Sequence, residues 1–180
     1  MTDLTAFLDK GWDLLAQGVA RRDHAARHVV LASLGADGPE QRILVLRGAD
    51  RDAGRIELHT DSASAKVTEL ARDPRAAVLV WVPEAQMQLR LAGRVAFLHA
   101  DPDRWGRIPQ AARTVYGGAP RPGTPIDSPE AFVTGAEIDR FTVLLCHLRR
   151  IEVLELGDRP HRRAVFDQPG NGWRGRWVAP

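Results

Sequence analysis

The sequence predicts a mainly β fold with peripheral helices, arranged as an antiparallel barrel. Several strand-like segments follow one another through short turns, and a few helical segments are inserted among them. Residues 87–97 alternate apolar and polar side chains with a period of two, which is the pattern of a strand with one buried face. Strands and helices do not alternate one for one, so a doubly wound parallel sheet is not expected.

Length and composition are those of an ordinary globular protein. The chain has 180 residues, of which 44% are hydrophobic and 27% charged, so it can bury a core and is too hydrophobic to be disordered. We expect a single domain over residues 1–180. Its N-terminal helix should cover residues 1–20, and a Gly- and Pro-rich loop should cover residues 117–130.

Charge and hydropathy limit the possible partners. The 25 basic and 23 acidic residues leave a net charge of +2, which does not favour non-specific binding of nucleic acid. No stretch approaches the ~18 apolar residues of a membrane span. Asp3 and Asp9 interrupt any signal-peptide pattern, so we expect a cytoplasmic protein without a membrane partner.

The first half of the chain contains an amphipathic helix, three strands and a second helix. Apolar residues at helical spacing mark the first helix, namely Leu4, Phe7, Leu8, Trp12, Leu15 and Val19. Strands are predicted over 28–34, 41–47 and 55–60, with a charged hairpin loop over 48–54. Ser62 or Ser64 can cap the second helix, which Asp73-Pro74 ends.

The second half continues with strands over 76–82, 87–97, 141–156 and 164–166. Gly93 is expected to form a bulge or a sharp bend. A helix should begin at Asp101-Pro102, with an apolar stripe of Trp105, Ile108, Ala112 and Val115. The single cysteine, Cys146, lies in an apolar strand and should pack in the core.

One stretch of the first half is suited to binding a phosphate. Arg42 opens one predicted strand, Thr60 closes the next, and Ser64 and Lys66 fall at the start of the following helix. Backbone N–H groups at a helix start, with a cation and a hydroxyl nearby, form an anion site. The alternative is a hairpin followed by a solvated helix start.

Several motifs, in order, resemble the FMN-binding split barrels related to pyridoxamine 5′-phosphate oxidase. They are the strand Arg42 to Arg47, the pair His59-Thr60, the helix start Ser64-Ala65-Lys66, the triplet Asp73-Pro74-Arg75, Gln88 five residues before Gly93, Arg159-Pro160-His161-Arg162-Arg163 with Trp173 ten residues later, and the ending Trp177-Val178-Ala179-Pro180. The resemblance implies an antiparallel Greek-key split barrel, an FMN cofactor, and a homodimer with FMN at the subunit interface.

The resemblance also implies roles for individual residues. The cofactor-binding positions are Arg42, Ile43, Leu44, Val45, His59, Thr60, Ser64, Lys66, Gln88 and Arg163, with Gln88 supplied by the second subunit. Arg159 and His161 would be catalytic and meet the substrate. The substrate phosphate would be held by Arg47, Tyr116, Arg121 and Thr124. The implied activity is that of an FMN-dependent oxidoreductase, with pyridoxamine or pyridoxine 5′-phosphate oxidised to pyridoxal 5′-phosphate.

Three departures from the family pattern leave alternatives open. Ala65 stands where the family has a second phosphate-binding arginine, Val153 falls where it has a tryptophan at the flavin edge, and Arg47 replaces a lysine. FMN is therefore better supported than the substrate. The alternatives are a flavin-binding carrier or sensor without that activity, and a split barrel that uses haem or a deazaflavin. No metal site is expected, because His59 has no second ligand at suitable spacing.

Overall fold

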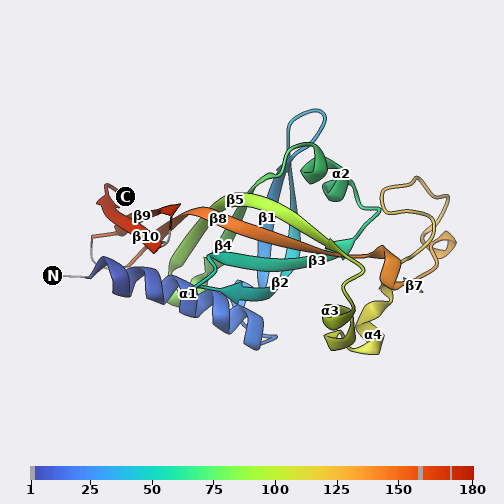
Figure 1. Cartoon of the computed structure of the whole chain (residues 1–180), viewed down its shortest axis with the longest axis horizontal. Helices are drawn as coiled ribbons and strands as arrows, with labels where there is room; N and C mark the ends of the chain where they lie inside the picture. The colour runs from blue at the N-terminus through green and yellow to red at the C-terminus, as the bar shows by residue number, and fades with distance from the viewer. Residues whose placement is uncertain (1–2, 158–159, 171) are drawn as a thin grey trace.

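Six antiparallel strands close into a barrel in the computed structural model, which describes residues 3–157, 160–170 and 172–180 (Figure 1). The order around the barrel is β8-β3-β2-β1-β4-β5, and β5 pairs back onto β8. The strands β4-β1-β2-β3 have the spatial order of a Greek key. The predicted antiparallel Greek-key split barrel is confirmed.

The elements have the following bounds. The strands are β1 (His28–Leu34), β2 (Pro39–Asp50), β3 (Arg55–Asp61), β4 (Arg75–Val82), β5 (Met87–His99), β6 (Val115–Tyr116), β7 (Gly135–Ala136), β8 (Phe141–Glu155), β9 (Arg162–Gly170) and β10 (Gly172–Val178). The α-helices are α1 (Leu4–Ala20), α2 (Ala65–Arg72), α3 (Pro102–Arg107) and α4 (Gln110–Arg113). Short 3₁₀ turns are η1 (Ala25–Arg27), η2 (Pro83–Ala85), η3 (Pro129–Ala131) and η4 (Ile138–Arg140).

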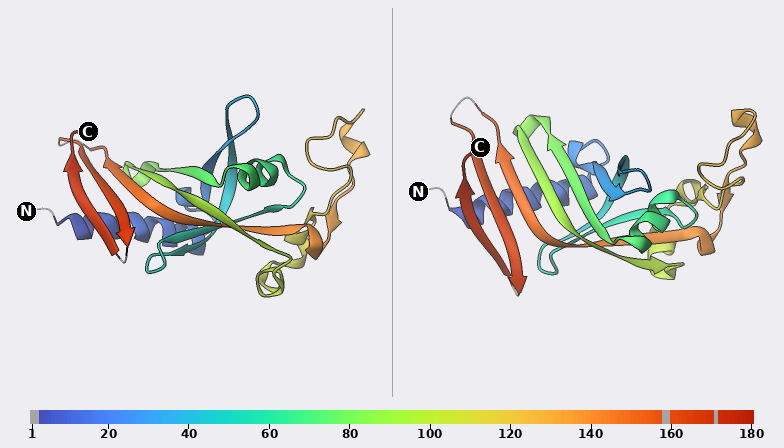
Figure 2. Two further views of the ribbon diagram at one scale, coloured as in Figure 1. Left: turned by 45° about the horizontal axis from the view of Figure 1, so that its top comes forward. Right: turned by 90° about the horizontal axis from the view of Figure 1, so that it is seen from above.

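Strand β8 pairs with three other strands. Its first half pairs with β3, its second half pairs with β9, and almost its whole length pairs with β5. The hairpin β9–β10 therefore extends the sheet beyond the barrel (Figure 2). The register between β5 and β8 shifts at Ala92/Gly93, where a Cβ on Gly93 would lie 2.1 Å from the carbonyl oxygen of His147. The bulge predicted at Gly93 is confirmed.

Helix α1 covers part of the barrel core. It lies against β2, β8 and β10, with Phe7, Leu8, Trp12 and Leu15 buried (Figure 1). Close approach occurs at Gly11, where an added Cβ would lie 3.3 Å from Leu89. The apolar spacing read from the sequence therefore placed the correct face of this helix against the barrel.

The helix predicted from Asp101 onward is broken in two, because a proline at position 109 cannot continue the hydrogen-bond ladder. Val115 belongs to β6 and is 66% exposed, so its assignment to the apolar stripe was wrong. Trp105 and Ile108 still pack, together with Tyr116, against Phe141 in a second, smaller core on the outer face of the sheet.

Two smaller differences concern the loops. The predicted hairpin loop over 48–54 is shorter, since β2 continues to Asp50. The segment after Tyr116 projects away from the barrel and returns at Phe141 (Figures 1 and 2). Within the described parts of the chain, no helix is long and apolar enough to cross a membrane, and no group of three His, Cys, Asp or Glu side chains could hold a metal ion.

Candidate functional site

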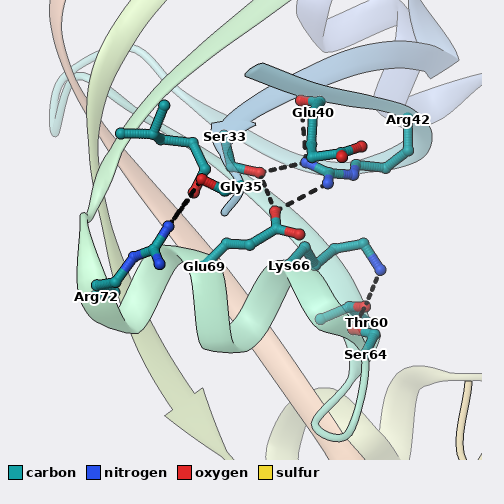
Figure 3. Close-up of polar contacts among 10 residues, drawn as sticks. Ser33, Gly35, Glu40, Arg42, Thr60, Ser64, Lys66, Glu69 and Arg72 are labelled. Carbon is teal, nitrogen blue, oxygen red and sulfur yellow. Dashed lines mark hydrogen bonds and ion pairs between the residues drawn. The ribbon is translucent and has the colours of Figure 1, made fainter. Parts of the chain in front are cut away.

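The end of β3 and the start of α2 bring three polar side chains together. The hydroxyls of Thr60 and Ser64 lie 3.0 Å apart, and Lys66 Nζ donates a hydrogen bond to Thr60 Oγ1 at 3.1 Å (Figure 3). Ser64 is the N-cap residue of α2, but its hydroxyl donates to the carbonyl oxygen of Asp61 at 2.7 Å instead of capping the helix. Among the described residues no side chain caps the start of α2, so its first N–H groups are left to donate hydrogen bonds to an anion.

Arg42 approaches the same region from β2. Its Nη2 donates to Glu69 Oε2 on α2 at 2.9 Å, and its Nη1 donates to Ser33 Oγ and to the carbonyl oxygen of Glu40 (Figure 3). Ser33 Oγ in turn donates to Glu69 Oε2 at 2.5 Å. The sequence reasoning did not include Glu69. The sequence did contain one indication of Glu69. It lies three residues after Lys66, and this spacing places both side chains on one face of α2.

The charge of Lys66 depends on these neighbours. Burial lowers the pKa of the Lys66 ammonium, and repulsion from Arg42 lowers it further. The carboxylates of Glu69 and Asp61 act in the opposite direction. The net effect is a pKa below the ordinary lysine value, as expected for an ammonium held in a partly buried cationic cluster.

A cavity of about 210 Å³ lies between η1, β2, β3 and α3. Its polar lining is mostly cationic and consists of Arg27, Arg47, Glu57, His59, Arg104 and Arg107. Two buried atoms of this lining, Arg47 Nε and His59 Nδ1, have no hydrogen-bond partner among the described residues. Unpaired buried polar atoms are costly, so a cationic lining with two of them fits an anionic ligand.

Glu57 organises one wall of this cavity. Its carboxylate is contacted by His59 Nε2 at 2.8 Å and by Arg104 Nε at 2.9 Å. Burial raises the pKa of Glu57, but the hydrogen bonds from His59 and Arg104 outweigh it, so the pKa lies below the ordinary glutamate value. Glu57 therefore holds His59 and Arg104 in place as a carboxylate.

The remaining predicted substrate-phosphate residues do not form one cluster. Tyr116 is 4% exposed and lies near Arg47, whose charge opposes the rise that burial causes in the tyrosine pKa. Arg121 and Thr124 are exposed on the projecting segment, and no described hydrogen bond joins them to Arg47. The structure thus brings Arg47 next to Tyr116 and α3 rather than next to Arg121 and Thr124.

The predicted flavin residues of β2 lie on or near the sheet surface. Ile43 is 67% exposed, whereas Leu44 and Val45 are half-buried. In the strand register, Val30 of β1 lies opposite both Ile43 and Leu79. These side chains form one row on the outer face of β2, β1 and β4.

Gln88 and Arg163 lie on the outer face of β5, β8 and β9. Gln88 is opposite Leu154, which is in turn opposite Arg163. Arg163 Nε donates to Glu152 Oε1 at 3.0 Å, and Arg90 Nη1 donates to the same oxygen at 3.1 Å. No described contact joins this group to Thr60 or Lys66.

The two predicted catalytic residues differ in what the structure describes. His161 is exposed just before β9. Arg159 lies outside the described residues. No described hydrogen bond or ion pair joins His161 to another residue that was predicted to bind the substrate.

Val153, which the resemblance places at the flavin edge, is a residue of the barrel core. Its side chain is fully buried in the barrel core, where an added Cβ on Gly11 would lie 3.5 Å from it. The outward-facing neighbours on β8 are Glu152 and Leu154. Leu154 and not Val153 therefore has its side chain on the outer face of the sheet.

Fold and site together define a split barrel with an uncapped helix start beside Lys66 and an arginine-lined cavity. The family model "Pyridoxamine 5′-phosphate oxidase, FMN-binding domain" matches residues 10–99. The chain belongs to this FMN-binding split-barrel family.

Individual relatives agree with this assignment. The chain is 31% identical over 177 residues to a pyridoxine/pyridoxamine 5′-phosphate oxidase of Anaeromyxobacter dehalogenans, covering 89% of this chain and 88% of the relative. It is 25% identical over 181 residues to pyridoxine/pyridoxamine 5′-phosphate oxidase 2 of Arabidopsis thaliana, covering 89% and 90%. A crystal structure of a pyridoxamine 5′-phosphate oxidase-related, FMN-binding protein from Nostoc punctiforme superposes with a TM-score of 0.81 at 25% identity, covering 99% of this chain and all of that one.

Proposed function

We propose that this protein is an FMN-dependent oxidoreductase. The observation that carries the proposal is the cluster of Lys66, Thr60 and Ser64 at the uncapped start of α2, in a family whose model is named for FMN binding. An ammonium and free helix N–H groups are the donors that a terminal phosphate requires, and the two hydroxyls can rotate from their present acceptors toward it. The chemistry of the site therefore fits the phosphate end of FMN.

Bound FMN would supply the redox chemistry, as the acceptor of a hydride from a substrate carbon. The protein's own contribution is binding and orientation. Lys66, Thr60 and Ser64 anchor the phosphate, and Ile43 and Val45 offer apolar surface along β2. The chain then has to hold the substrate beside the cofactor.

We assign the anionic end of the substrate to the arginine-lined cavity. Arg47 lines it together with Arg27, Arg104 and Arg107, and the unpaired Nε of Arg47 is a ready donor. A substrate with one phosphate, such as pyridoxamine or pyridoxine 5′-phosphate, suits this lining. His161 and Arg159 are proposed to meet the substrate ring.

We further propose that the functional unit is a homodimer. The outer face of β1, β4 and β5 carries Leu79 at 40% and Trp81 at 43% exposure, next to a hollow of about 370 Å³. Gln88 lies opposite Trp81 on this face, and Ile43 lies in the same row as Leu79. A second copy docked here would cover the apolar side chains and bring its Gln88 toward the flavin strand.

Sedimentation of the wild type should give a dimer, and Leu79→Arg should shift it to a monomer with weakened FMN binding. A monomeric wild type that holds FMN would refute the dimer.

The activity is tested with purified protein. Apo-protein titrated with FMN should take it up, and oxygen-free addition of pyridoxamine 5′-phosphate should bleach the flavin absorbance and yield pyridoxal 5′-phosphate. Pyridoxamine without phosphate is the control for the arginine-lined cavity and should bleach the flavin far more slowly. A protein that takes up no FMN would refute the proposal.

A second candidate is a flavin-binding carrier or sensor without turnover. The observation that favours it is Ala65, which leaves the phosphate cluster without a second arginine. FMN uptake without any bleaching by substrate would support this candidate over the oxidase.

A further inference from the structure

Glu69 brings a carboxylate into the cluster that is proposed to hold the cofactor phosphate. Its Oε2 accepts hydrogen bonds from Arg42 Nη2 at 2.9 Å and from Ser33 Oγ at 2.5 Å. The side chains of Arg42 and Glu69 are 20% and 13% exposed, so this ion pair is largely shielded from water. In Figure 3 the guanidinium points toward Ser33 and Glu69, while Lys66 Nζ points toward Thr60.

The side-chain charges of this cluster neutralise a phosphate monoester only in part. Arg42 and Lys66 are cationic, Glu69 is anionic, and Ala65 contributes no charge, so the side chains sum to about +1. A phosphate monoester carries about −1.5 to −2 at neutral pH. A dianion placed at the start of α2 would therefore meet incomplete neutralisation and repulsion from Glu69.

We propose that Glu69 competes with the cofactor phosphate for Arg42 and so limits the preference of this site for FMN over the unphosphorylated flavin. The inference rests on the proposed function. The carboxylate holds Arg42 and repels the phosphate, and both effects weaken the binding of FMN. Glu69 is thus a specificity-determining residue whose effect depends on the phosphate and not on the flavin ring.

The test compares FMN with riboflavin, which lacks the phosphate. Glu69→Gln keeps the size of the side chain and an oxygen that can accept from Ser33 and Arg42, and it removes the charge. Titrations followed by flavin fluorescence should show the Kd for FMN falling about tenfold, as expected for one close charge interaction, with the Kd for riboflavin unchanged. Asp13→Asn, the same chemical change on the exposed surface of α1, is the matched control and should leave both unchanged.

A second variant separates competition from repulsion. In an Arg42→Ala background, Glu69→Gln should give a clearly smaller gain in FMN affinity, because Arg42 is no longer there to be released. A gain of undiminished size would overturn the competition for Arg42. An unchanged or weakened FMN affinity in Glu69→Gln alone, or an equal gain for riboflavin, would overturn the inference as a whole.

A readout without flavin is available because the chain has lysines only at positions 10 and 66. The Glu69 carboxylate raises the pKa of Lys66, so Glu69→Gln should lower the pKa of Lys66. An NMR pH titration of isotope-labelled lysine side chains measures this pKa, with Lys10 as the internal reference. An unshifted Lys66 pKa would overturn the claim that Glu69 and Lys66 belong to one charge cluster.

A wild type that binds no FMN would overturn the proposed function, whereas a wild type that binds FMN with no gain in Glu69→Gln would overturn this inference alone.

Discussion

Asp61 holds Arg140 through one carboxylate oxygen, which accepts from Arg140 Nε at 3.0 Å and from Nη2 at 2.8 Å. The other oxygen accepts from the backbone N–H of Gly117 at 2.8 Å. Gly117 follows β6 and Arg140 precedes β8, so the two residues flank the segment between these strands. This segment projects from the barrel (Figure 2). A single carboxylate thus fastens both ends of this segment beside Thr60.

Asp61→Asn should loosen the projecting segment. The amide cannot neutralise Arg140, so we expect a loss of about 2 kcal/mol in the free energy of unfolding. Limited proteolysis should cut the segment 118–134 faster than in the wild type. Asp127→Asn, an exposed change within the segment itself, should leave the cleavage rate unaltered. Equal cleavage of wild type and Asp61→Asn would show that other contacts hold the segment.

Much of the barrel could be predicted because its signals are local. The period-two alternation of 87–97 and the apolar spacing of the first helix depend only on which face is buried. The bulge at Gly93 followed from a glycine inside a strand pattern. The break at Pro109 was missed because the apolar spacing of Trp105, Ile108 and Ala112 continues across it.

The candidate site was harder to predict because it depends on contacts across the barrel. Thr60, Ser64 and Lys66 lie close together in sequence, within residues 60–66, and were found together. Glu69 contacts Arg42, which is 27 residues away in sequence, so no local spacing showed that the two meet. Leu89 and Val153 lie opposite each other in paired strands, so their side chains point to the same face of the sheet. Once Leu89 is known to face the core, Val153 is expected to face it too.

Lys66→Ala should weaken FMN binding by tenfold or more. The expected loss is one charge-assisted contact of about 1.5–3 kcal/mol, and Ala65 leaves no neighbouring cation on the helix start to replace it. Fluorescence titration of FMN measures the change, and riboflavin should bind as before. Lys10→Ala is the control, because Lys10 forms its ion pair with Glu155, which is not part of this cluster. Unaltered FMN affinity would remove Lys66 from the phosphate site.

Glu57 should give the protein a measurable acid sensitivity. Its pKa is depressed in the folded state, so its stabilising effect is present above its unfolded pKa of about 4.3 and is lost as the pH falls through the lower folded pKa. The difference in unfolding free energy between wild type and Glu57→Gln should therefore be large near neutral pH and shrink below about pH 4. Urea denaturation between pH 3 and 7 measures it. The exposed Glu84→Gln should show a difference near zero at every pH. A Glu57→Gln difference that stays constant down to pH 3 would contradict the assignment.

Gly93→Ala should destabilise the barrel at its closure. The new Cβ would lie 2.1 Å from the carbonyl oxygen of His147, which is backbone and cannot move without breaking the pairing of β5 with β8. We expect a loss of about 3 kcal/mol or more in urea denaturation. Gly106→Ala meets no atom within 4 Å and lies in α3, so it should be neutral or stabilising. Wild-type stability in Gly93→Ala would mean that the bulge can relax.

Cys146 should report on the opening of the barrel. Burial raises the pKa of its thiol to about 12, so almost none of the reactive thiolate exists in the folded protein at pH 8. The side chain is also 2% exposed on β8, between β3 and β5. A thiol reagent should therefore label native protein only as fast as β8 becomes exposed, and labelling should accelerate steeply across the urea transition. Gly93→Ala, which weakens the pairing beside Cys146, should raise the labelling rate in buffer, whereas Gly106→Ala should not. Rapid labelling of the native wild type would contradict the buried position of this thiol.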